Sequence, residues 1–341
     1  MKKKKILFIG GTTGGGVATI NNEVIRIFRK AGNEYALIDT EKMKSKVPTP
    51  IAYIICYMIA FFEILIGKPD LVYLQLAQSG YTHQAFFLAI AGFLGKETIA
   101  HLHAKSDLKG ATTEKQFDAI LSSRKYIDKM ILLTKPCMDA LIQNGWDKPA
   151  YVIPNFISTD SLPMRYKTVT QRDKMLYLGR MNWEKGIYEV LEIARRLKDE
   201  QFLFVGNIDN EEDRKRFTEE LESVENACWL GPMYGDEKYN IIADSKFLIF
   251  PTRRDEFPMT LIESTILGCV PLVTDTGSVG EIIKDGFNGF YISPDDVAGI
   301  VEKIVRWKDD PGLQEISDNG IRFAKDNFTT GAVEKKLLEI V

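Results

Sequence analysis

The sequence predicts an α/β protein made of two doubly wound domains, each with a parallel sheet between layers of helices. Its 341 residues are too many for one ordinary hydrophobic core. Short apolar segments of strand length alternate with longer amphipathic segments, which is typical of strand–helix–strand units. Because such a series starts at Lys5 and starts again at Lys174, we expect domains over residues 1–157 and 158–327.

The composition is that of a globular protein, with 45% apolar and 27% charged residues. The net charge of −3 hides an asymmetry, because the first 155 residues carry 20 Lys/Arg and only 13 Asp/Glu. A basic first half suggests a domain that faces something anionic, and an uneven surface charge without function is the alternative. The four cysteines show no C-x-x-C spacing, so we expect reduced, mostly buried thiols in a cytosolic protein.

The chain opens with a strand, a glycine loop and a helix. The strand is Lys5–Ile9, the loop covers residues 10–16, and the helix ends at Gly32. Glycines allow a backbone to approach a ligand closely, so the loop can hold a diphosphate at the start of the helix. We therefore predict ligand contacts at Gly14, Gly15 and Gly16. The helix face expected to enter the core carries Ile20, Val24, Ile27 and Phe28.

A dinucleotide site is a second interpretation of this opening. Asp39, at the end of the next strand (Tyr35–Ile38), stands where a ribose-binding carboxylate would be expected. The loop lacks the third glycine of the G-x-G-x-x-G pattern, because Thr19 occupies that position. A nicotinamide-dependent enzyme is thus the weaker alternative.

An apolar segment follows at residues 51–66, interrupted by Glu63. Its sixteen residues fall short of the roughly 20 needed to span a bilayer. Two interpretations stay open: a buried helix, or a helix whose exposed apolar face lies in a membrane interface. Lysines at positions 42, 44, 46 and 68 bracket the segment and would suit anionic lipid head groups.

Two histidines end a strand of the first domain. The strand Glu97–His103 places His101 and His103 on one face at its carboxyl end, where open α/β sheets bind ligands. A structural role is the alternative for either one, but we expect a functional pair, with Lys105 and Ser106 lining the mouth of the site. Other strands of this domain are expected at 69–74, 129–133 and 150–153, with helices at 82–94, 118–123 and 138–144.

The second domain is organised around the stretch Pro251–Glu263. A buried strand, Phe247–Phe250, delivers this loop, and a helix is expected to begin near Pro258. Free amides at the helix start suit an anion such as phosphate. Asp255 and Glu263 flank that start and could hold a polyhydroxylated ligand. The amides in question belong to Met259, Thr260 and Leu261.

A cationic element precedes that stretch by about seventy residues. The strand Lys174–Leu178 delivers Arg180 and Lys185 within G-R-x-x-x-x-K-G. Arg can hold two phosphate oxygens and Lys supplies a mobile point charge, whereas a salt-bridged surface pair is the alternative. Other strands of this domain are expected at 202–205, 227–230 and 270–274, with helices at 187–197, 211–222, 239–244, 277–285, 297–307 and 314–327.

The two elements together resemble the nucleotide-sugar site of family 4 retaining glycosyltransferases, which have the GT-B fold. The interdomain element of that family is similar to Pro154–Ile157, with Phe156 in place of Gly. One residue departs from the family pattern, because Asp255 stands where Glu is usual. The resemblance implies two Rossmann-like domains facing across a cleft, and a last helix, residues 328–341, that packs back on the first domain.

The resemblance also implies the roles of individual residues. The glycine loop would close over the donor diphosphate, Arg180 and Lys185 would neutralise it, and Glu263 would bind the ribose. Catalysis would involve His103 near the donor sugar and Asp255 on its hydroxyls. Further donor contacts would come from Met233 near the base and from the loop and helix start, Phe257 and Pro258. No metal and no cofactor is implied, since no D-x-D motif stands beside these elements.

The implied function is transfer of a sugar, with retention, from a UDP-sugar or GDP-sugar to a saccharide or lipid-linked saccharide in polysaccharide assembly. Partners would be the donor, the acceptor and an anionic membrane surface touched peripherally, and no nucleic acid. The expected location is the cytoplasm or the inner face of the cytoplasmic membrane. A catalytically inactive sugar-nucleotide-binding or scaffolding protein of the same fold is the alternative.

Overall fold

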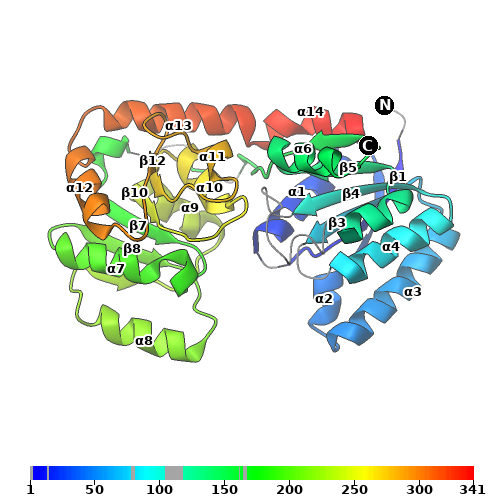
Figure 1. The fold of residues 1–341 in the computed structure, drawn as a ribbon, viewed down its shortest axis with the longest axis horizontal. Helices are drawn as coiled ribbons and strands as arrows, with labels where there is room; N and C mark the ends of the chain where they lie inside the picture. Colours follow the sequence, from blue (N-terminus) through cyan, green and yellow to red (C-terminus); the bar gives the residue numbers. More distant parts are fainter. Residues whose placement is uncertain (1–2, 14, 78–80, 104–117, 161, 164–166) are drawn as a thin grey trace. The chain divides into compact units, whose positions relative to one another are not determined.

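The computed structural model describes residues 3–13, 15–77, 81–103, 118–160, 162–163 and 167–341. The predictions made for Gly14, Lys105 and Ser106 lie outside these residues. The chain divides into two units (Figure 1). Unit 1 comprises Met1–Ile157 with Thr330–Val341, and unit 2 comprises Ser158–Thr329.

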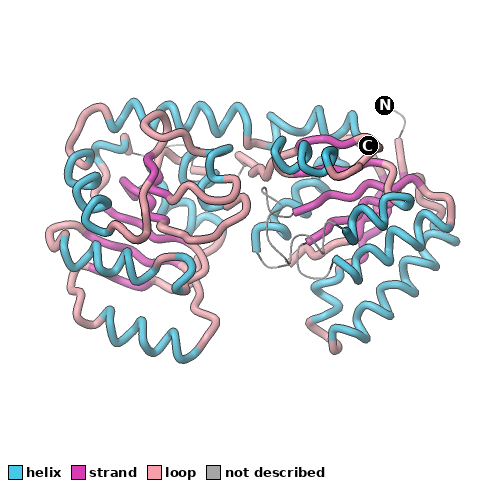
Figure 2. Tube along the Cα trace, in the orientation of Figure 1, coloured by secondary structure: helices cyan, strands magenta, loops and turns pink. Residues whose placement is uncertain are grey.

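Unit 1 is an α/β domain with a six-stranded parallel sheet. The sheet order is β2-β1-β3-β4-β5-β6, and helices lie on both of its faces (Figure 2). The strands are β1 (Lys5–Ile9), β2 (Glu34–Ile38), β3 (Leu71–Ala77), β4 (Glu97–His103), β5 (Lys129–Leu132) and β6 (Ala150–Val152). The helices are α1 (Gly15–Lys30), α2 (Thr40–Lys44), α3 (Thr49–Gly67), α4 (Tyr81–Phe93), residues 118–123, α6 (Lys135–Gln143) and α14 (Thr330–Ile340).

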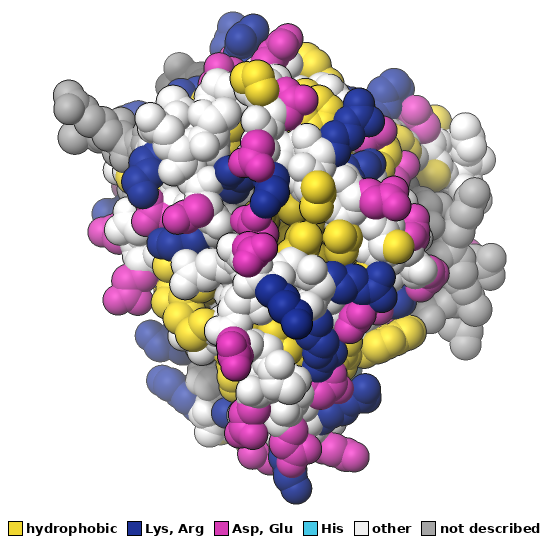
Figure 3. Space-filling model, turned by 90° about the vertical axis from the view of Figure 1, so that its left-hand side faces the viewer, with side chains coloured by type: hydrophobic (Ala, Val, Ile, Leu, Met, Phe, Trp, Pro, Cys, Tyr) yellow, Lys and Arg dark blue, Asp and Glu magenta, His cyan; other side chains and the backbone are white. Residues whose placement is uncertain are grey.

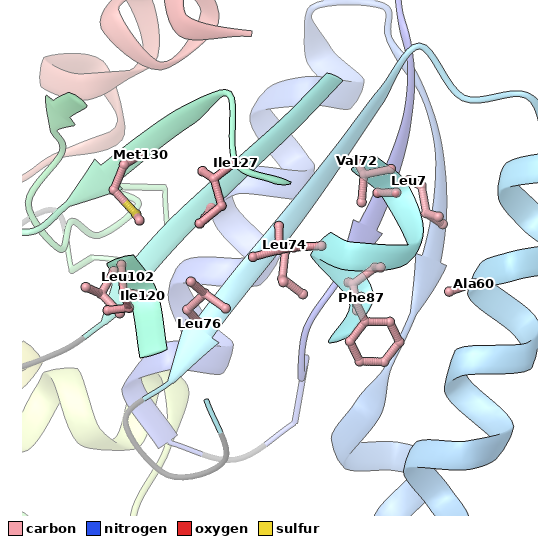
Figure 4. Close-up of a cluster of buried hydrophobic side chains, with 14 of the residues drawn as sticks. Leu7, Ala60, Val72, Leu74, Leu76, Phe87, Leu102, Ile120, Ile127 and Met130 are labelled. Carbon is pink, nitrogen blue, oxygen red and sulfur yellow. The ribbon is translucent and has the colours of Figure 1, made fainter. Parts of the chain in front are cut away.

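The core of unit 1 forms because its inner strands are apolar throughout, as parallel strands covered on both faces must be. Leu7 of β1, Val72 and Leu74 of β3 and Phe87 of α4 meet in one buried cluster (Figure 4). The predicted inner face of α1 is confirmed, since Ile20, Val24, Ile27 and Phe28 are all buried. The hydrophobic spacing of this helix therefore fixes which side it turns to the sheet.

The order in which the chain adds strands to the sheet of unit 1 reverses between β1 and β3, although the two strands are parallel. From β1 the chain goes to β2 on one side and then returns to β3 on the other. At such a switch point the loops after the two strands diverge and leave room for a ligand at the carboxyl edge. The loop that begins at Gly10 leaves β1 at this point.

Unit 2 has a second six-stranded parallel sheet with the order β12-β11-β10-β7-β8-β9. Its reversal lies between β7 and β10, which pair in parallel. The strands are β7 (Lys174–Leu178), β8 (Gln201–Val205), β9 (Ala227–Trp229), β10 (Ser245–Phe250), β11 (Val270–Val273) and β12 (Phe290–Tyr291). The helices are α7 (Ile187–Arg196), α8 (Glu211–Leu221), α9 (Gly235–Asp244), α10 (Met259–Ile266), α11 (Val279–Ile282), α12 (Val297–Trp307) and α13 (Leu313–Asn327).

The charged side chains of the second half are mixed in sign on the face that Figure 3 shows. On the face shown in Figure 3, basic and acidic side chains are interspersed, with apolar side chains between them. The charged helix α8 follows this pattern, because three of its basic residues pair with glutamates three or four positions away. Such pairs stabilise an exposed helix and need no partner molecule.

The last helix belongs to unit 1. In α14 the side chains of Val333, Leu337 and Ile340 are buried. The amide of Thr330 donates to the carbonyl of Ile157 at 2.9 Å, and Lys129 Nζ donates to the carbonyl of Ile340 at 2.7 Å. The helix is thus held at both ends by residues that lie far away in the sequence.

Helix α3 differs from the expectation for residues 51–66. The helix has 19 residues, from Thr49 to Gly67, and so begins before residue 51. Pro50 fits its first turn, because an amide hydrogen has no helical partner there. Within the described part of the chain it is the one helix whose length and composition would suffice to cross a membrane, so the prediction that the segment is too short was wrong. One face is buried and the other exposed, which also contradicts a fully buried helix.

Candidate functional site

The candidate site of unit 2 is built on the carboxyl edge of its sheet. Because β7 and β10 are neighbours, the loops that follow them lie side by side at the switch point. All six residues of β10 are buried, and the chain then turns polar from Arg253 to Glu256 before α10 begins. The local sequence thus ends a strand, exposes a short charged loop and starts a helix.

Two glycines let the loop after β10 lie very close to its neighbours. Gly186 has φ +77°, and a Cβ there would lie 2.5 Å from the carbonyl oxygen of Pro251. Gly277 has φ +57°, and a Cβ there would lie 2.0 Å from the carbonyl oxygen of Asp255. The amide of Arg253 also donates to the carbonyl of Glu184 at 2.8 Å. The charged loop is therefore held from both sides by backbone contacts.

Lys185 and Asp255 form an ion pair across the two loops. Lys185 Nζ lies 2.7 Å from Asp255 Oδ2, and each side chain is only 19% exposed. Lys185 also donates to the carbonyl of Arg254, and Asp255 Oδ1 accepts from the amide of Glu256 at 2.9 Å. Two residues predicted from separate motifs are thus brought together, with a positioned cation at the switch point.

Arg180 is placed differently from Lys185. Its side chain is 70% exposed, and its closest charge is Asp209, with Nε–Oδ2 at 3.5 Å. Such an exposed pair contributes little to stability, so this guanidinium is available to an anion. The predicted role of Arg180 and Lys185 in neutralising a donor diphosphate stays a prediction.

Arg253, which sequence analysis did not single out, has a structural role. Its guanidinium lies 2.7 Å from Glu189 and 3.2 Å from Asp295, and 4.7 Å from the ring centre of Trp183. These contacts connect the loop to α7 and to the segment before α12. Arg253 therefore fixes the loop, while the neighbouring Arg254 side chain is exposed.

The start of α10 presents fewer free amides than predicted. The Leu261 amide donates to the Pro258 carbonyl at 3.1 Å. The prediction that this amide is free to bind an anion was therefore wrong. Within the described residues, the amides of Met259 and Thr260 keep no such acceptor. Leu261 and Phe257 are buried, and the ring of Phe257 packs against Phe328 at 5.9 Å. These two side chains support the site from the core.

Glu263 is buried and paired with a residue that sequence analysis missed. Only 4% of Glu263 is exposed, and Lys238 Nζ of α9 lies 2.7 Å from its Oε1. Burial raises the pKa of Glu263, and the charge of Lys238 opposes that rise. No sequence signal marks Lys238, because only the packing of α9 on α10 brings it to Glu263. Met233, half-buried, lies in the loop before α9.

The glycine loop of unit 1 is shaped by two asparagines. Asn21 Nδ2 donates to the carbonyl of Gly11 at 2.6 Å, and Asn22 Nδ2 donates to that of Thr12 at 3.0 Å. Gly15 starts α1 with φ +67° and has open space on its Cβ side, and Gly16 follows it in the first turn. The loop is thus fixed before the helix, while Gly15 and Gly16 at the helix start are exposed.

Asp39 has a local role that needs no dinucleotide. It caps α2 by accepting from the Lys42 amide at 2.9 Å, and it accepts from the hydroxyl of Thr12. Both carboxylate oxygens are therefore used to join the glycine loop to α2.

His101 and His103 lie on one face of β4, as predicted, with ring centres 4.3 Å apart. His103 Nε2 is 2.5 Å from Gln75 Oε1, and Tyr73 Oη is 3.0 Å from His101 Nδ1. Burial lowers the pKa of His103 to about 4, against a hydrogen bond with Asn155 that raises it. Burial and the neighbouring His103 lower the pKa of His101 further still. Both rings are neutral near pH 7 and serve as hydrogen-bonding groups.

No metal-binding cluster is present among the described residues, where no group of three His, Cys, Asp or Glu side chains converges. The cysteines are free, and all but Cys228 are buried, as the composition predicted.

Part of the chain matches a known protein family. Residues 160–323 match the family model described as glycosyl transferases group 1. This stretch is a glycosyltransferase group 1 domain. It lies within unit 2 and contains every candidate residue of the β7–β10 switch point.

Two relatives are similar over part of the chain, and a solved structure is similar over nearly all of it. The chain is 27% identical over 129 residues to granule-bound starch synthase 1 of Pisum sativum, covering 36% of this chain but only a fifth (20%) of that protein's length. It is 25% identical over 168 residues to the capsular polysaccharide biosynthesis glycosyltransferase CapM of Staphylococcus aureus, covering 47% and 43%. HepE of Anabaena, solved with UDP-glucose, has the same fold, with a TM-score of 0.74, 14% identity and 99% of each chain covered. Both units together therefore match the GT-B fold.

Proposed function

We propose that the protein transfers a sugar from a nucleoside diphosphate sugar to an acceptor with retention at the anomeric carbon, as a family 4 enzyme. The observation that carries this proposal is the Lys185–Asp255 pair at the switch point of the group 1 domain. The ammonium of Lys185, positioned after β7, and the free amides of Met259 and Thr260 at the start of α10 both suit the diphosphate of a donor.

The proposed mechanism needs positive charge where the bond to the donor breaks. As the bond between the anomeric carbon and the diphosphate oxygen breaks, negative charge grows on the leaving group. Lys185 and the exposed Arg180 neutralise that charge, and Asp255 accepts hydrogen bonds from donor-sugar hydroxyls. The acceptor oxygen bonds to the anomeric carbon from the same face, and its proton passes to a phosphate oxygen of the departing diphosphate. No metal and no cofactor takes part in this proposal.

Other residues hold the donor rather than react. Glu263 binds the ribose hydroxyls, and Met233 lies against the base. From unit 1, His103 donates or accepts a hydrogen bond at the donor sugar or the acceptor, and the glycine loop at Gly15 and Gly16 approaches the diphosphate. The start of α10 is held in position by the buried residues Phe257, Pro258 and Leu261.

The similarity to CapM supports an acceptor in polysaccharide assembly, either a saccharide or a lipid-linked saccharide. We place the protein in the cytoplasm, in peripheral contact with the inner face of the cytoplasmic membrane. The solved complex of HepE supports a UDP-sugar as the first donor to test, ahead of a GDP-sugar. An inactive sugar-nucleotide-binding protein is the second candidate, favoured by Asp255 in place of the longer Glu.

The test is a thermal-shift panel of UDP, GDP, ADP and CMP on the full chain, with Lys185→Ala and Glu263→Ala beside it. A shift of several degrees with one diphosphate, lost in both variants, supports the site. Transfer to a saccharide acceptor with an unchanged anomeric configuration in the product, read by NMR, supports the reaction. Absence of any nucleotide shift overturns the proposal, and binding without turnover favours the inactive alternative.

A further inference from the structure

The outward side of α3 is an apolar surface that no described residue covers. Eight large apolar side chains of this helix are between 37% and 78% exposed. They recur every three or four residues, so most of them share one side of the helix. We call these residues the α3 face; they are Ile51, Ile54, Met58, Ile59, Phe61, Phe62, Leu65 and Ile66.

The helix cannot turn to hide this face. Its opposite side carries Ala52, Tyr53, Cys56, Ala60 and Ile64, which are buried in unit 1. Ala60 points toward the cluster that holds Phe87 (Figure 4). Burial of these side chains fixes the rotation of α3 about its axis.

Neighbouring α4 extends the apolar surface. The ring of Phe86 is 53% exposed and meets the Tyr57 ring of α3 edge-on at 4.7 Å. Phe93, at the end of α4, is 85% exposed. A surface of this kind, spread over two packed helices, indicates an interaction site rather than scattered exposure.

Lysines outnumber carboxylates at the ends of α3, where Glu41 and Asp70 are also exposed. Lys42 and Lys46 are exposed just before it, and Lys68 is exposed just after it. Between them the helix carries a single charged side chain, Glu63, which is half-buried. Long lysine side chains can reach anionic head groups while the apolar row enters the boundary of the acyl chains.

The charges argue against a second copy of the chain as the occupant. An antiparallel pair of α3 helices would set Lys42 and Lys46 of one copy beside Lys68 of the other, and a parallel pair would set equal lysines together. Either arrangement places like charges at the rim of an apolar contact. An anionic bilayer meets the same rim with opposite charge.

We infer that the α3 face docks unit 1 onto an anionic lipid bilayer, with α3 lying along the interface. The helix is about 28 Å long at 1.5 Å per residue and contributes its whole outer side in this orientation. A spanning orientation would remove its buried side from the core of unit 1. This inference deepens the proposed membrane contact and rests on the proposed function for its biological purpose.

The first test is co-sedimentation of the full chain with vesicles of phosphatidylcholine, alone or mixed with phosphatidylglycerol. Binding to the anionic vesicles only, weakened by high salt, is the expected result. The triple variant Ile54→Ser/Phe62→Ser/Ile66→Ser should bind at least tenfold more weakly, and so should Lys42→Gln/Lys46→Gln/Lys68→Asn. The matched control Ile142→Ser/Val305→Ser/Phe287→Ser changes three apolar side chains of 44–52% exposure elsewhere and should bind like the wild type.

The inference is overturned by absence of vesicle binding by the wild type, by equal loss in the control, or by unchanged binding in the lysine variant. Light scattering that shows a dimer lost only in the Ile54/Phe62/Ile66 variant assigns the face to self-association and also overturns it. Circular dichroism of every variant establishes that the fold is kept.

A second test examines the orientation. Cys228 is the exposed cysteine, so single cysteines are placed at positions 51, 58 and 66 in a Cys228→Ser chain and labelled with a polarity-sensitive dye. A helix lying flat gives similar quenching depth at all three positions, whereas a deep position 58 between shallow ends overturns that orientation. The UDP thermal shift and transfer to a water-soluble acceptor are read in parallel. If the UDP shift and the transfer are kept but vesicle binding is absent, the docking inference is rejected and the proposed function stands. If vesicle binding is kept but the UDP shift and the transfer are absent, the proposed function is rejected and the docking inference stands.

Discussion

Glu263 shows how a single buried carboxylate depends on its partner. Only 6% of its side chain is exposed, so ionisation must be compensated inside the protein, and Lys238 at 2.7 Å does so. Among the described residues, Lys238 is the charged group that acts on the pKa of Glu263. The lysine therefore keeps the carboxylate able to accept hydrogen bonds from a ligand.

Replacing Lys238 by Met should make stability depend on pH. The pKa of Glu263 is already raised above 4.5 by burial, and loss of the ammonium raises it further. Above that ordinary value the folded state then holds more protons than the unfolded one, so stability falls as pH rises. We expect a loss of about 3 kcal/mol near neutral pH, which shrinks toward about pH 5. Urea unfolding at several pH values measures it.

The double variant Lys238→Met/Glu263→Gln serves as the control for Lys238→Met. It removes the buried ionisation and should flatten the pH slope again. Lys336→Met, an exposed substitution in α14, should behave like the wild type. An equal pH slope in Lys238→Met and the wild type would contradict the assigned role.

The buried histidines of unit 1 predict the opposite dependence of stability on pH, with stability rising as pH rises. The pKa of His103 is lowered to about 4, whereas an unfolded histidine titrates near its usual 6.5. Between these values the unfolded state binds more protons, so stability falls as pH drops from about 6.5 toward 4. His103→Gln should lessen this loss by up to about 1.4 kcal/mol for each pH unit in that window. Exposed His83→Gln is the control, and equal losses in both variants would refute the prediction.

At the scale of elements, the site depends on how closely neighbouring segments approach. The loop after β10 fits because Gly277, before α11, lets the backbone of Asp255 come near. The amide of Ser278 donates to the carbonyl of Glu256 at 2.9 Å across the same contact. A side chain at position 277 would push the loop, and Asp255 with it, away from Lys185.

Gly277→Ala should therefore damage both stability and donor binding. The left-handed φ of +57° costs about 1–3 kcal/mol for alanine, and the clash with the Asp255 carbonyl adds to this cost. Gly286→Ala is the matched control, because Gly286 has φ +72° and no atom within 4 Å of its Cβ position. Urea unfolding should show the smaller loss in the control, and UDP affinity should fall only in Gly277→Ala. Equal effects would mean that the contact is unimportant.

At the scale of the whole molecule, the chain forms two units with separate sheets, and its last helix belongs to the first of them. In α14 three buried side chains cover unit 1, although the sequence enters this helix directly from unit 2. The last helix of the sequence is therefore part of the hydrophobic core of the first unit.

Ending the chain before Thr330 should destabilise unit 1 alone. Loss of buried Val333, Leu337 and Ile340 removes apolar contacts worth several kcal/mol. Urea unfolding followed by tryptophan fluorescence and proteolysis should show the transition of unit 1 at lower urea, with that of unit 2 unchanged. The exposed double substitution Lys335→Gln/Lys336→Gln should shift neither transition, and a joint shift of both units in the truncated chain would contradict the prediction.

The sequence by itself determined the fold class and most elements, because buried parallel strands are apolar throughout and glycines end the helices beside them. β1, β4, β7 and α12 have the predicted bounds. The predictions failed where local pattern is weak. Two-residue β12 was not predicted, α9 begins at Gly235 instead of Tyr239, and the expected helix at 277–285 is only Val279–Ile282.

Only the tertiary structure decided which charges meet. Lys185 and Asp255 are seventy positions apart, and they pair because β7 and β10 are neighbours at the reversal of the sheet. Lys238 reaches Glu263 because α9 packs on α10, and the Leu261 amide is used within its own turn. Strands and helices follow from short-range sterics and hydrophobic period, whereas ion pairs, free amides and the exposed side of α3 follow from long-range packing, which no local pattern encodes.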